Sequence, residues 1–476
     1  GRSGSGAGDV GGDGQPDLFA GAVWANTGTW KALGAAALFS GRTGQILWRF
    51  NGLEHDEQFG TSVSMVDDVD GDGVIDLLVG APGRKVNGLY RAGSVELYSG
   101  ATGGLIYRLD GGNPSGWFGT AVAATGDLDA DGRGDFVVGE PTAIRSAGNV
   151  EGQGAVHVFS GAAGTTLWDA GGTWRSGFGE AVCGVGDVDL DGIPDIGVGA
   201  SGWSKPQAAP WGSAFVLSGA TGRIIHHFGG QPVWERKNWD FRPHFGYSVA
   251  GVGDANGDGC PDILVGEPWA SPRRMAFRGS AKLFSGLDGK LLHRFDGDKD
   301  DVRFGMSVAG AGDVNRDGLA DLVVGSQDSF QAGEFRSGSV SVFTLLPYLI
   351  PDTTKLAARL GATVQLDLDF PISEAGQAYV VLASLAGTGP TTLAGLTVPL
   401  SSDRLLRRMA GGWSPPLLRN GKGALGPAGD ARATLHGHSA LAPLIGSRLY
   451  LAAASYHAGT GTGRLSSIAR WIEIVP

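Results

Sequence analysis

The chain contains very few cysteines and no long apolar run. Cys183 and Cys260 are its only cysteines in 476 residues. They are too few for a disulfide framework, although a single bridge between neighbouring repeats stays open as an alternative. No apolar run reaches the ~20 residues that a membrane-spanning helix needs. No signal peptide is visible at Gly1, as expected of a mature or trimmed chain. These absences predict a globular chain without a membrane span.

The usual catalytic signatures are also missing. The sequence has no His-Glu-x-x-His, no Gly-x-Ser-x-Gly, no P-loop and no dinucleotide fingerprint. The nine histidines are scattered. The sequence therefore predicts no enzyme and no catalytic residues.

Glycine and clustered aspartate are abundant instead. Gly accounts for 84 residues, without the Gly-X-Y period of collagen. Within the stretch Asp68–Asp76, carboxylates occupy positions 1, 3, 5 and 9, and a glycine occupies position 6. Like charges this close repel unless a cation lies among them. Dense hard oxygen ligands suit Ca²⁺. The loop closes at position 9, too early for an EF-hand, and an apolar run follows. It is therefore interpreted as a calcium site between two strands.

The loop recurs six times, with starts at residues 9, 68, 127, 187, 254 and 313. A near-constant period of this kind indicates a repeat architecture. Twenty-one of the 48 acidic residues lie at ligand positions, so six Ca²⁺ would bring the formal charge of −11 to about +1. Sites of modest affinity fill where calcium is millimolar, which predicts a secreted or cell-surface protein.

Each repeat of about 60 residues predicts four strands. In the second repeat, strand a begins at Phe59-Gly60 and the calcium loop is the a–b turn. Strand b covers 77–80, strand c 93–100 and strand d 105–109. Four antiparallel strands repeated radially indicate an all-β propeller with six blades, or seven if a further repeat exists.

These repeats, with Phe-Gly, Asp-x-Asp/Asn-x-Asp-Gly-x-x-Asp and Val-Gly-Ala/Glu-Pro, resemble FG-GAP repeats, as in the integrin α-subunit propeller and many secreted bacterial proteins. The resemblance covers residues 1–345. It implies that the side chains of positions 1, 3, 5 and 9 and the carbonyl of position 7 bind calcium. The implied ligands are Asp9, Asp13, Gln15, Asp17, Asp68, Asp70, Asp72, Val74, Asp76, Asp127, Asp129, Asp131, Arg133, Asp135, Asp187, Asp189, Asp191, Ile193, Asp195, Asp254, Asn256, Asp258, Cys260, Asp262, Asp313, Asn315, Asp317, Leu319 and Asp321.

Three loops depart from the family pattern. Position 3 is Gly11 in the first loop, which removes a ligand. It is Asn256 in the fifth and Asn315 in the sixth, which removes a charge. The second, third and fourth loops are therefore predicted to bind most tightly.

The repeat pattern ends before strand d of the sixth blade. Residues upstream of Gly1, the segment Tyr348–Ile350 or a strand from another molecule are the alternatives for filling that edge. Residues 1–346 are assigned to the propeller, and 351–476 to a β-sandwich of six or seven strands. The sandwich residues carry 11 Lys/Arg and 7 Asp/Glu, a net +4, which leaves −15 on the rest of the chain and argues against nucleic acid.

The b–c and d–a connections lie at the end of a propeller opposite the a–b calcium loops. They are rich in tryptophan and arginine, including Arg84, and this predicts a recognition surface for a protein or carbohydrate. Packing of long loops is the competing interpretation for each Trp. The candidate ligand-binding residues are Trp203, Trp211, Trp234, Trp239, Trp269, Arg273 and Arg274.

Two short motifs are not expected to function. Arg133-Gly134-Asp135 spells an integrin-binding tripeptide, but Asp135 is a predicted calcium ligand. His436-Gly437-His438 lacks further metal ligands.

The sequence thus predicts an extracellular calcium-binding adhesion, scaffold or surface-assembly protein, which self-associates if the sixth-blade edge is open. A secreted enzyme that acts on polysaccharide or lipid is the alternative.

Overall fold

The structure is a computed structural model that describes residues 3–25, 33–144, 153–172, 176–202, 211–230, 243–256, 258–270, 278–297, 303–314, 319–327, 338–344, 349–351, 353, 355–359, 361–370, 376–387, 390–393, 396–411, 415–427, 430–457, 459–466 and 470–476. The chain divides into two compact units. The first comprises Gly1–Gly253, Cys260–Asn315 and Ala320–Phe343, and the second comprises Asp254–Gly259, Arg316–Leu319 and Thr344–Pro476.

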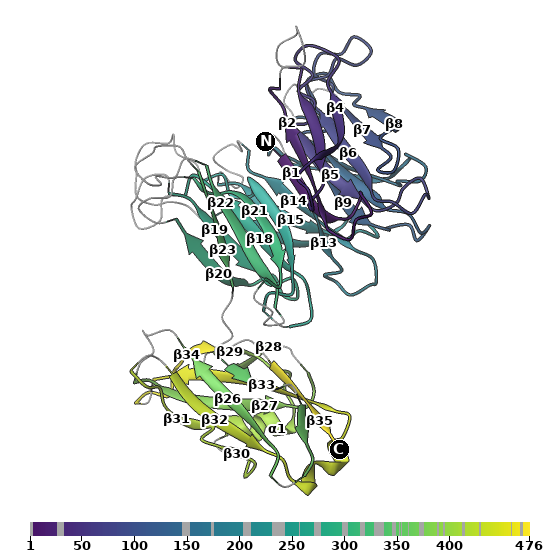
Figure 1. The fold of residues 1–476 in the computed structure, drawn as a ribbon. Coiled ribbons are helices and arrows are strands. Elements are labelled where there is room, and N and C mark those ends of the chain that lie inside the picture. The colour runs from purple at the N-terminus through teal and green to yellow at the C-terminus, as the bar shows by residue number, and fades with distance from the viewer. Residues whose placement is uncertain are drawn as a thin grey trace, which may run out of the picture. The chain divides into compact units, whose positions relative to one another are not determined.

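The first unit contains six antiparallel sheets, one for each repeat (Figure 1). The first three are β1–β4 (Ser3–Gly8, Asp17–Ala22, Ala35–Phe39, Ile46–Asn51), β5–β8 (Ser62–Val66, Asp76–Ala81, Ser94–Tyr98, Leu105–Asp110) and β9–β12 (Ala121–Gly126, Asp135–Glu140, Ala155–Phe159, Thr166–Gly171). The others are β13–β16 (Ala181–Gly186, Asp195–Ala200, Ser213–Leu217, Ile224–Gly229), β17–β20 (Ser248–Gly253, Asp262–Glu267, Ser280–Phe284, Leu291–Asp296) and β21–β23 (Phe304–Gly312, Asp321–Ser326, Ser339–Phe343). The prediction of six blades is confirmed. We number the sheets as blades 1 to 6.

The Phe-Gly pair joins each blade to the one before it. Phe118 is buried (4% exposed) and forms a parallel bridge with Gly93, which directly precedes β7, the third strand of blade 2. Gly93 has φ +87°, and a Cβ there would lie 2.1 Å from the Phe118 carbonyl oxygen. Only glycine permits this close approach. The bridge recurs as Gly34–Phe59, Gly154–Phe178, Gly212–Phe245 and Gly279–Phe304.

The apolar core of the first unit lies between successive blades. Val95 and Leu97 of β7 pack with Phe118, Phe136 and Val138 of blade 3, and all five are buried. Similar clusters join blades 1 and 2, 3 and 4, and 4 and 5. Alternate residues of a strand face opposite sides of the sheet. Each blade therefore uses one side for the preceding blade and the other for the following blade.

The second unit contains two larger sheets that share one apolar core. One is ordered β24-β26-β32-β30 (Leu349–Pro351, Thr363–Asp369, Asp430–His436, Leu418–Arg419). The other is β25-β35-β33-β27-β31 (Lys355–Ala357, Arg470–Val475, Arg448–Tyr456, Ala378–Ser384, Lys422–Ala424), with β34 (Gly463–Ser466) paired to β33. β28 (Pro390–Leu393) and β29 (Leu396–Pro399) form a hairpin. This arrangement confirms the predicted C-terminal β-sandwich.

Several details of the second unit were not expected from the sequence. The structure has more strands than the six or seven predicted, because seven of them are only two to four residues long. The helix α1 (Arg404–Ala410) and a 3₁₀ helix (Ser439–Leu444) were also missed. Asp403 caps α1 by accepting a hydrogen bond from the Leu406 amide (2.6 Å). Short elements like these carry too little periodicity to be recognised from sequence.

Two open alternatives are decided by the structure. Leu349–Pro351 pairs with Leu366–Leu368 inside the second unit, so the proposed filling of blade 6 by Tyr348–Ile350 is wrong. Neither Cys183 nor Cys260 forms a disulfide, so the alternative of a bridge between repeats is wrong too. None of the helices in the described part of the chain is long and apolar enough to cross a membrane.

Candidate metal centre

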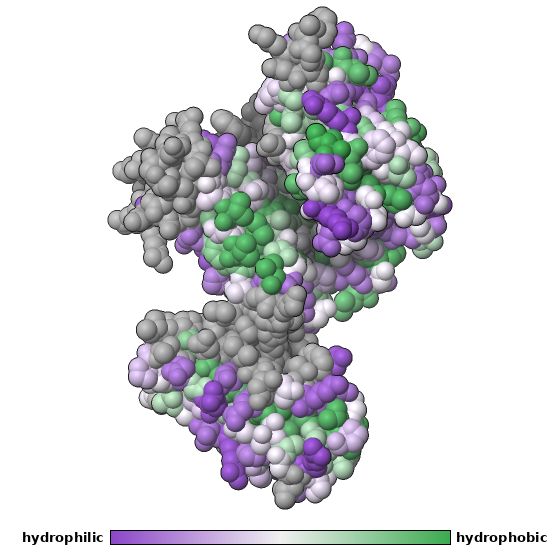
Figure 2. Space-filling view, in the orientation of Figure 1, coloured by the Kyte–Doolittle hydropathy of each residue, from purple (hydrophilic) through white to green (hydrophobic). Residues whose placement is uncertain are grey.

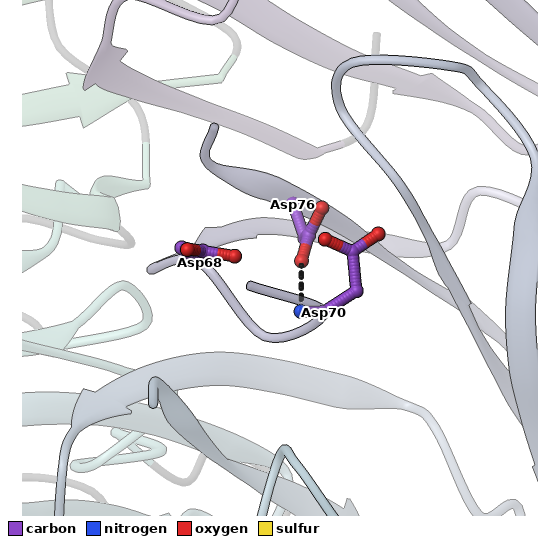
Figure 3. Close-up of side chains that lie close together, drawn as sticks. All are labelled: Asp68, Asp70 and Asp76. Carbon is purple, nitrogen blue, oxygen red and sulfur yellow. Dashed lines mark hydrogen bonds between the residues drawn. The ribbon is translucent and has the colours of Figure 1, made fainter. Parts of the chain in front are cut away.

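The second loop brings three carboxylates together at the turn between β5 and β6 (Figure 3). Asp68, Asp70 and Asp76 each place a carboxylate oxygen within 4.8 Å of the other two. Three negative charges at this distance repel one another unless a cation lies between them. All the donor atoms are hard oxygens, as Ca²⁺ and Mg²⁺ prefer. The chemistry of the donor set therefore fits a divalent cation.

Backbone amides hold the loop in this conformation. The Asp68 carboxylate accepts hydrogen bonds from the amides of Gly71 (2.5 Å), Asp72 (3.1 Å) and Gly73 (2.9 Å). Gly71 and Gly73 both have positive φ, which glycine adopts without strain. The glycine-rich sequence thus lets the chain fold around its own first aspartate.

Asp76, at position 9, is fully buried and links the loop to the next hairpin. Its carboxylate accepts hydrogen bonds from the amides of Val69 (2.8 Å) and Gly100 (3.0 Å). Burial raises the pKa of Asp76 to about 6, although these two hydrogen bonds act in the opposite direction. Gly100 lies in the turn between the third and fourth strands. The a–b loop and the c–d turn therefore share one end of the blade, as predicted.

The third and fourth loops repeat this geometry. Their carboxylate clusters are Asp127–Asp129–Asp135 and Asp187–Asp189–Asp195. Burial raises the pKa of Asp135 and of Asp195 to about 6 as well. The Gly161 amide donates to Asp135 (2.8 Å), and the Gly219 amide donates to Asp195 (3.0 Å). The loops with this cluster are those ranked tightest from sequence, and the ranking itself stays a prediction.

The aspartate at position 5 of the second, third and fourth loops accepts a hydrogen bond within its own loop. Asp72 accepts a hydrogen bond from the Val74 amide (2.9 Å), and Asp131 and Asp191 accept the equivalent bonds from Arg133 (2.8 Å) and Ile193 (2.9 Å). Position 7, whose carbonyl is the predicted ligand, thus donates its amide to position 5.

The first loop keeps the backbone arrangement with fewer carboxylates. Asp9 accepts hydrogen bonds from the amides of Asp13 (3.0 Å) and Gly14 (2.7 Å). Gly11, which stands at position 3, donates its amide to Asp17 (2.7 Å). Gln15, at position 7, is exposed. The missing side chain at position 3 leaves one carboxylate fewer for a cation.

The fifth and sixth loops are described in part. Asp254 accepts hydrogen bonds from the amides of Asp258 (3.1 Å) and Gly259 (2.9 Å), and Asn256 Oδ1 accepts one from Asp258 (2.8 Å). Of the other predicted ligands, Cys260, Asp262, Leu319 and Asp321 are buried and Asp313 is exposed. Asn315 and Asp317 lie outside the described residues.

Arg133 bridges two neighbouring loops. Its guanidinium Nη1 lies 3.3 Å from Asp68 Oδ2 of the second loop. Within the same tripeptide, Asp135 is fully buried and bonded to backbone amides. Arg133-Gly134-Asp135 therefore does not present its carboxylate to solvent.

The second short motif, His436-Gly437-His438, lies in the second unit. There His438 caps the 3₁₀ helix by accepting a hydrogen bond from the Ala440 amide (3.0 Å).

The predicted ligand-binding surface is described at two of its seven residues. Trp211 and Trp269 are both half-buried. The Trp269 ring packs against His244 (4.7 Å between centroids) and Tyr247 (5.2 Å), with Arg303 above it (5.8 Å). Intramolecular packing thus accounts for much of the Trp269 surface. Trp203, Trp234, Trp239, Arg273 and Arg274 lie outside the described residues.

Arg84 does not belong to an exposed surface. It is 4% exposed, and its guanidinium lies between Glu57 (2.7 Å) and Glu96. Tyr98 donates its hydroxyl to the same Glu96. The two carboxylates satisfy the buried cation. The expectation that Arg84 helps to form the recognition surface is therefore wrong. Its role is structural.

A repeated contact that sequence reasoning missed connects the outer strands. Trp48 Nε1 donates to the Gly100 carbonyl of the next blade (2.7 Å). Tyr107, Trp168 and His226, at the same place in β8, β12 and β16, lie 2.7 Å or less from the corresponding Gly161, Gly219 and Gly286 carbonyls. Alignment of the fourth strands would have shown that this position always holds a ring with a polar atom.

Comparison with known proteins agrees with this architecture. The family model described as "FG-GAP repeat" matches residues 59–98, 118–159, 245–281 and 304–343, which lie in blades 2, 3, 5 and 6. The first unit is an FG-GAP β-propeller. The chain is 36% identical to integrin alpha-IIb of Mus musculus over 40% of its own length and 19% of that protein. It is 34% identical to integrin alpha-V of Gallus gallus over 44% of its length and 20% of that protein.

The propeller is also similar to a solved structure described as "Structure of Dos1 propeller". The sequence identity is 11% and the TM-score is 0.38, and the similarity covers 66% of this chain and 63% of that one. The chain spans about a fifth of the length of the integrin relatives above.

Proposed function

We propose that this propeller is a calcium-binding module of an extracellular adhesion or scaffold protein without enzymatic activity. The carboxylate clusters of the second, third and fourth loops carry the proposal, because their oxygens converge and repel one another. The similarity to integrin alpha subunits supports an extracellular setting, where millimolar calcium fills sites of modest affinity.

The chain's own residues suggest what cation binding would do. In the second loop, Asp68, Asp70 and Asp76 would hold the ion, with Asp72 and the Val74 carbonyl completing the predicted set. A bound Ca²⁺ supplies two positive charges that offset the clustered carboxylates. Asp76 also holds the c–d turn through the Gly100 amide, so the loop and that turn would become rigid together. Up to six ions are proposed, with the second to fourth loops filled first.

Partner contacts are proposed at the opposite end of the blades. Residues 1–346 would act as the propeller domain and 351–476 as a separate sandwich domain. The proposed contact residues are Trp203, Trp211, Trp234, Trp239, Trp269, Arg273 and Arg274, and the partner is a protein or a carbohydrate. Self-association through the open edge of blade 6 is part of the same proposal.

A calcium titration tests the metal sites. We expect isothermal calorimetry of the full chain, first dialysed against chelator, to show at least three tight sites. Asp68→Asn, Asp127→Asn and Asp187→Asn combined should remove them, because each substitution takes a charge from one cluster. Asp110→Asn, in an exposed ion pair with Arg108 on β8, is the matched control. Retention of tight binding by the triple variant would overturn the assignment of these loops.

A second experiment tests the contact surface. Alanine at Trp234, Trp239, Arg273 and Arg274 together should weaken calcium-dependent binding to a glycan array, or calcium-dependent self-association in sedimentation. Arg49→Ala combined with Arg108→Ala, on the outer strands, is the control. If the quadruple variant behaves like the unmodified chain in both assays, the proposed surface is wrong, whatever the calcium titration shows.

A further inference from the structure

The turn between the third and fourth strands of a blade contacts the calcium loop of the same blade. In blade 2, Gly100 of this turn donates its amide to the Asp76 carboxylate (3.0 Å). A Cβ on Gly100 would lie 1.9 Å from the carbonyl oxygen of Ile75, at position 8 of the loop. The Ser99 hydroxyl donates to Asp72, at position 5 (3.4 Å). The turn is therefore fitted closely to the conformation of the loop.

The preceding blade contacts the same turn. Trp48 of β4 donates its Nε1 hydrogen to the Gly100 carbonyl oxygen (2.7 Å). Its ring lies against Gly103, where a Cβ would come within 2.6 Å of the indole Cε3. The side chain of Val10, at position 2 of the first calcium loop, would lie 2.9 Å from a Cβ on Gly100. Gly100 thus connects the calcium loop of its own blade to the blade before it.

The same arrangement recurs at the next three boundaries between blades. A glycine of the turn again donates its amide to the aspartate at position 9 and accepts a hydrogen bond from a ring of the preceding blade. In the order ring, glycine and aspartate, the three sets are Tyr107–Gly161–Asp135, Trp168–Gly219–Asp195 and His226–Gly286–Asp262.

The four rings share a hydrogen-bond donor rather than a shape. We call Trp48, Tyr107, Trp168 and His226 the outer rings. An indole, a phenol and an imidazole differ in size, but each places one N–H or O–H on the glycine carbonyl oxygen. For His226 the partner is a carbonyl oxygen, which only accepts, so Nε2 carries the hydrogen. Packing alone would admit phenylalanine here, so the repeated donor indicates that the hydrogen bond itself has a role.

The outer rings lie on the surface of the blades and within reach of the charge of the loops. All four are half-buried. Figure 2 shows hydrophilic and apolar side chains intermixed where Figure 1 labels β4 and β8, which carry the first two rings. Burial raises the pKa of the Tyr107 hydroxyl, and the negative charges of Asp135 and Asp76 raise it further. Tyr107 therefore keeps its hydrogen and remains a donor.

These contacts place each ring two hydrogen bonds away from a carboxylate of the next loop. Partners that orient a metal ligand typically change metal affinity by about 10–100-fold. The turn glycine is such a partner for the aspartate at position 9, and the outer ring in turn holds the glycine. A turn that is already in place needs less ordering when a cation binds, which favours binding.

We propose that the outer rings are positioning residues for the calcium loop of the following blade, and that calcium in that loop strengthens the attachment of the preceding blade. Coupling between two binding events is reciprocal, so the factor that the ring adds to calcium affinity is also the factor that calcium adds to the ring contact. The proposal rests on the proposed calcium function and deepens it, because the cation would control the cohesion between blades.

Tyr107 allows a test that removes one oxygen atom. Asp68→Asn with Asp187→Asn leaves the third loop as the intact one of the three carboxylate clusters. In that background, Tyr107→Phe should lower the calcium affinity of the third loop by about threefold to tenfold, less than for a direct partner of a ligand. Terbium luminescence with calcium competition measures the change. Unchanged affinity would overturn the proposal.

Two further variants separate the hydrogen bond from packing. Tyr90→Phe is the matched control, because Tyr90 is 55% exposed in the connection at the other end of blade 2, and it should leave the affinity unchanged. Tyr107→Trp supplies the indole N–H that the neighbouring blades use at this place, and should restore the affinity to within about twofold. A loss in Tyr107→Trp as large as in Tyr107→Phe would assign the effect to packing and overturn the proposal.

Indole signals give a readout in the otherwise unmodified chain. With ¹⁵N-labelled tryptophan, calcium should shift the Nε1–H resonances of Trp48 and Trp168, which Trp48→Phe and Trp168→Phe identify. Asp68→Asn should abolish the shift of Trp48 alone, because it disables the second loop. Asp187→Asn should abolish that of Trp168 alone. If neither signal responds to calcium, or both respond alike in each variant, the coupling between ring and loop is absent.

Calorimetry on the same samples distinguishes this proposal from the calcium function on which it rests. Tight calcium sites, with Tyr107→Phe behaving like the unmodified chain, would overturn only the coupling between blades. A chain that binds no calcium would overturn both proposals.

Discussion

The propeller and the sandwich differ most in what they bury. The propeller buries ionisable side chains in nearly every blade, including Glu57, Arg84, Glu96, Glu267 and Lys282, in addition to the position 9 aspartates. Among the described residues of 344–476, the buried polar side chains are two serines, Ser384 and Ser455. Both parts are all-β, yet among the described residues only the propeller buries acidic and basic side chains, whose charge needs a partner.

The apolar cores differ in the same way. The sandwich has one continuous core built from both of its larger sheets. The propeller divides its core into separate clusters, each shared by two successive blades. A divided core gives each blade less apolar contact, so cations and buried ion pairs matter more to its stability. The predictions below test this difference.

Removal of calcium should have the largest effect. A site filled at about 100 times its dissociation constant adds roughly 2.7 kcal/mol, so three sites add roughly 8 kcal/mol to the propeller. We expect EGTA to lower the propeller transition strongly in differential scanning calorimetry, while the sandwich transition stays in place. An equal shift of both transitions would contradict the comparison.

Loss of the buried Arg84 guanidinium should have the second largest effect on stability. Arg84→Met leaves Glu57 and Glu96 buried without their cation, which costs about 3–5 kcal/mol of unfolding free energy. Arg108→Met breaks an exposed pair with Asp110 and should cost about 0–1 kcal/mol. Urea denaturation in saturating calcium measures both. Similar values for the two variants would show that burial of the charge does not matter here.

A single carboxylate of the second loop should have a smaller effect. Asp70→Asn gives this loop the donor set of the fifth and sixth loops, and should weaken its calcium affinity about tenfold, or ~1.4 kcal/mol. Terbium luminescence with calcium competition measures the change. The same substitution at Asp110 is the control. Unchanged affinity would mean that Asp70 is not a ligand.

The smallest expected effect concerns Arg133. Its guanidinium lies against Asp68 and competes with a cation for that carboxylate. Arg133→Gln should therefore raise calcium affinity in the second loop by about twofold to fivefold, as for a partly exposed ion pair of ~0.5–1 kcal/mol. Arg49→Gln, an exposed arginine on β4, is the control in the same titration. A fall in affinity would show that Arg133 supports the loop instead.

Much of the propeller could be predicted because its signals are local and repeated. The Asp loop and the alternating strands occur six times and the Phe-Gly pair five times, so the assignment of each repeat can be checked against the others. Gly93 and Gly100 illustrate why: each sits where a Cβ would meet a backbone carbonyl oxygen, at 2.1 Å and 1.9 Å. Such positions admit only glycine, so the sequence by itself determined the repeat, the strand order and the carboxylate loops.

Tertiary structure decided what depends on distant neighbours. Arg84 was expected on a surface, but two glutamates from other segments enclose it. Trp269 stays a proposed ligand contact, but only the structure shows that its half-buried ring also packs on His244 and Tyr247. Leu349–Pro351 was one candidate for the missing strand of blade 6, but it pairs with a strand of the sandwich. A residue type states what a side chain can do, whereas burial and partners arise only when segments far apart in sequence meet.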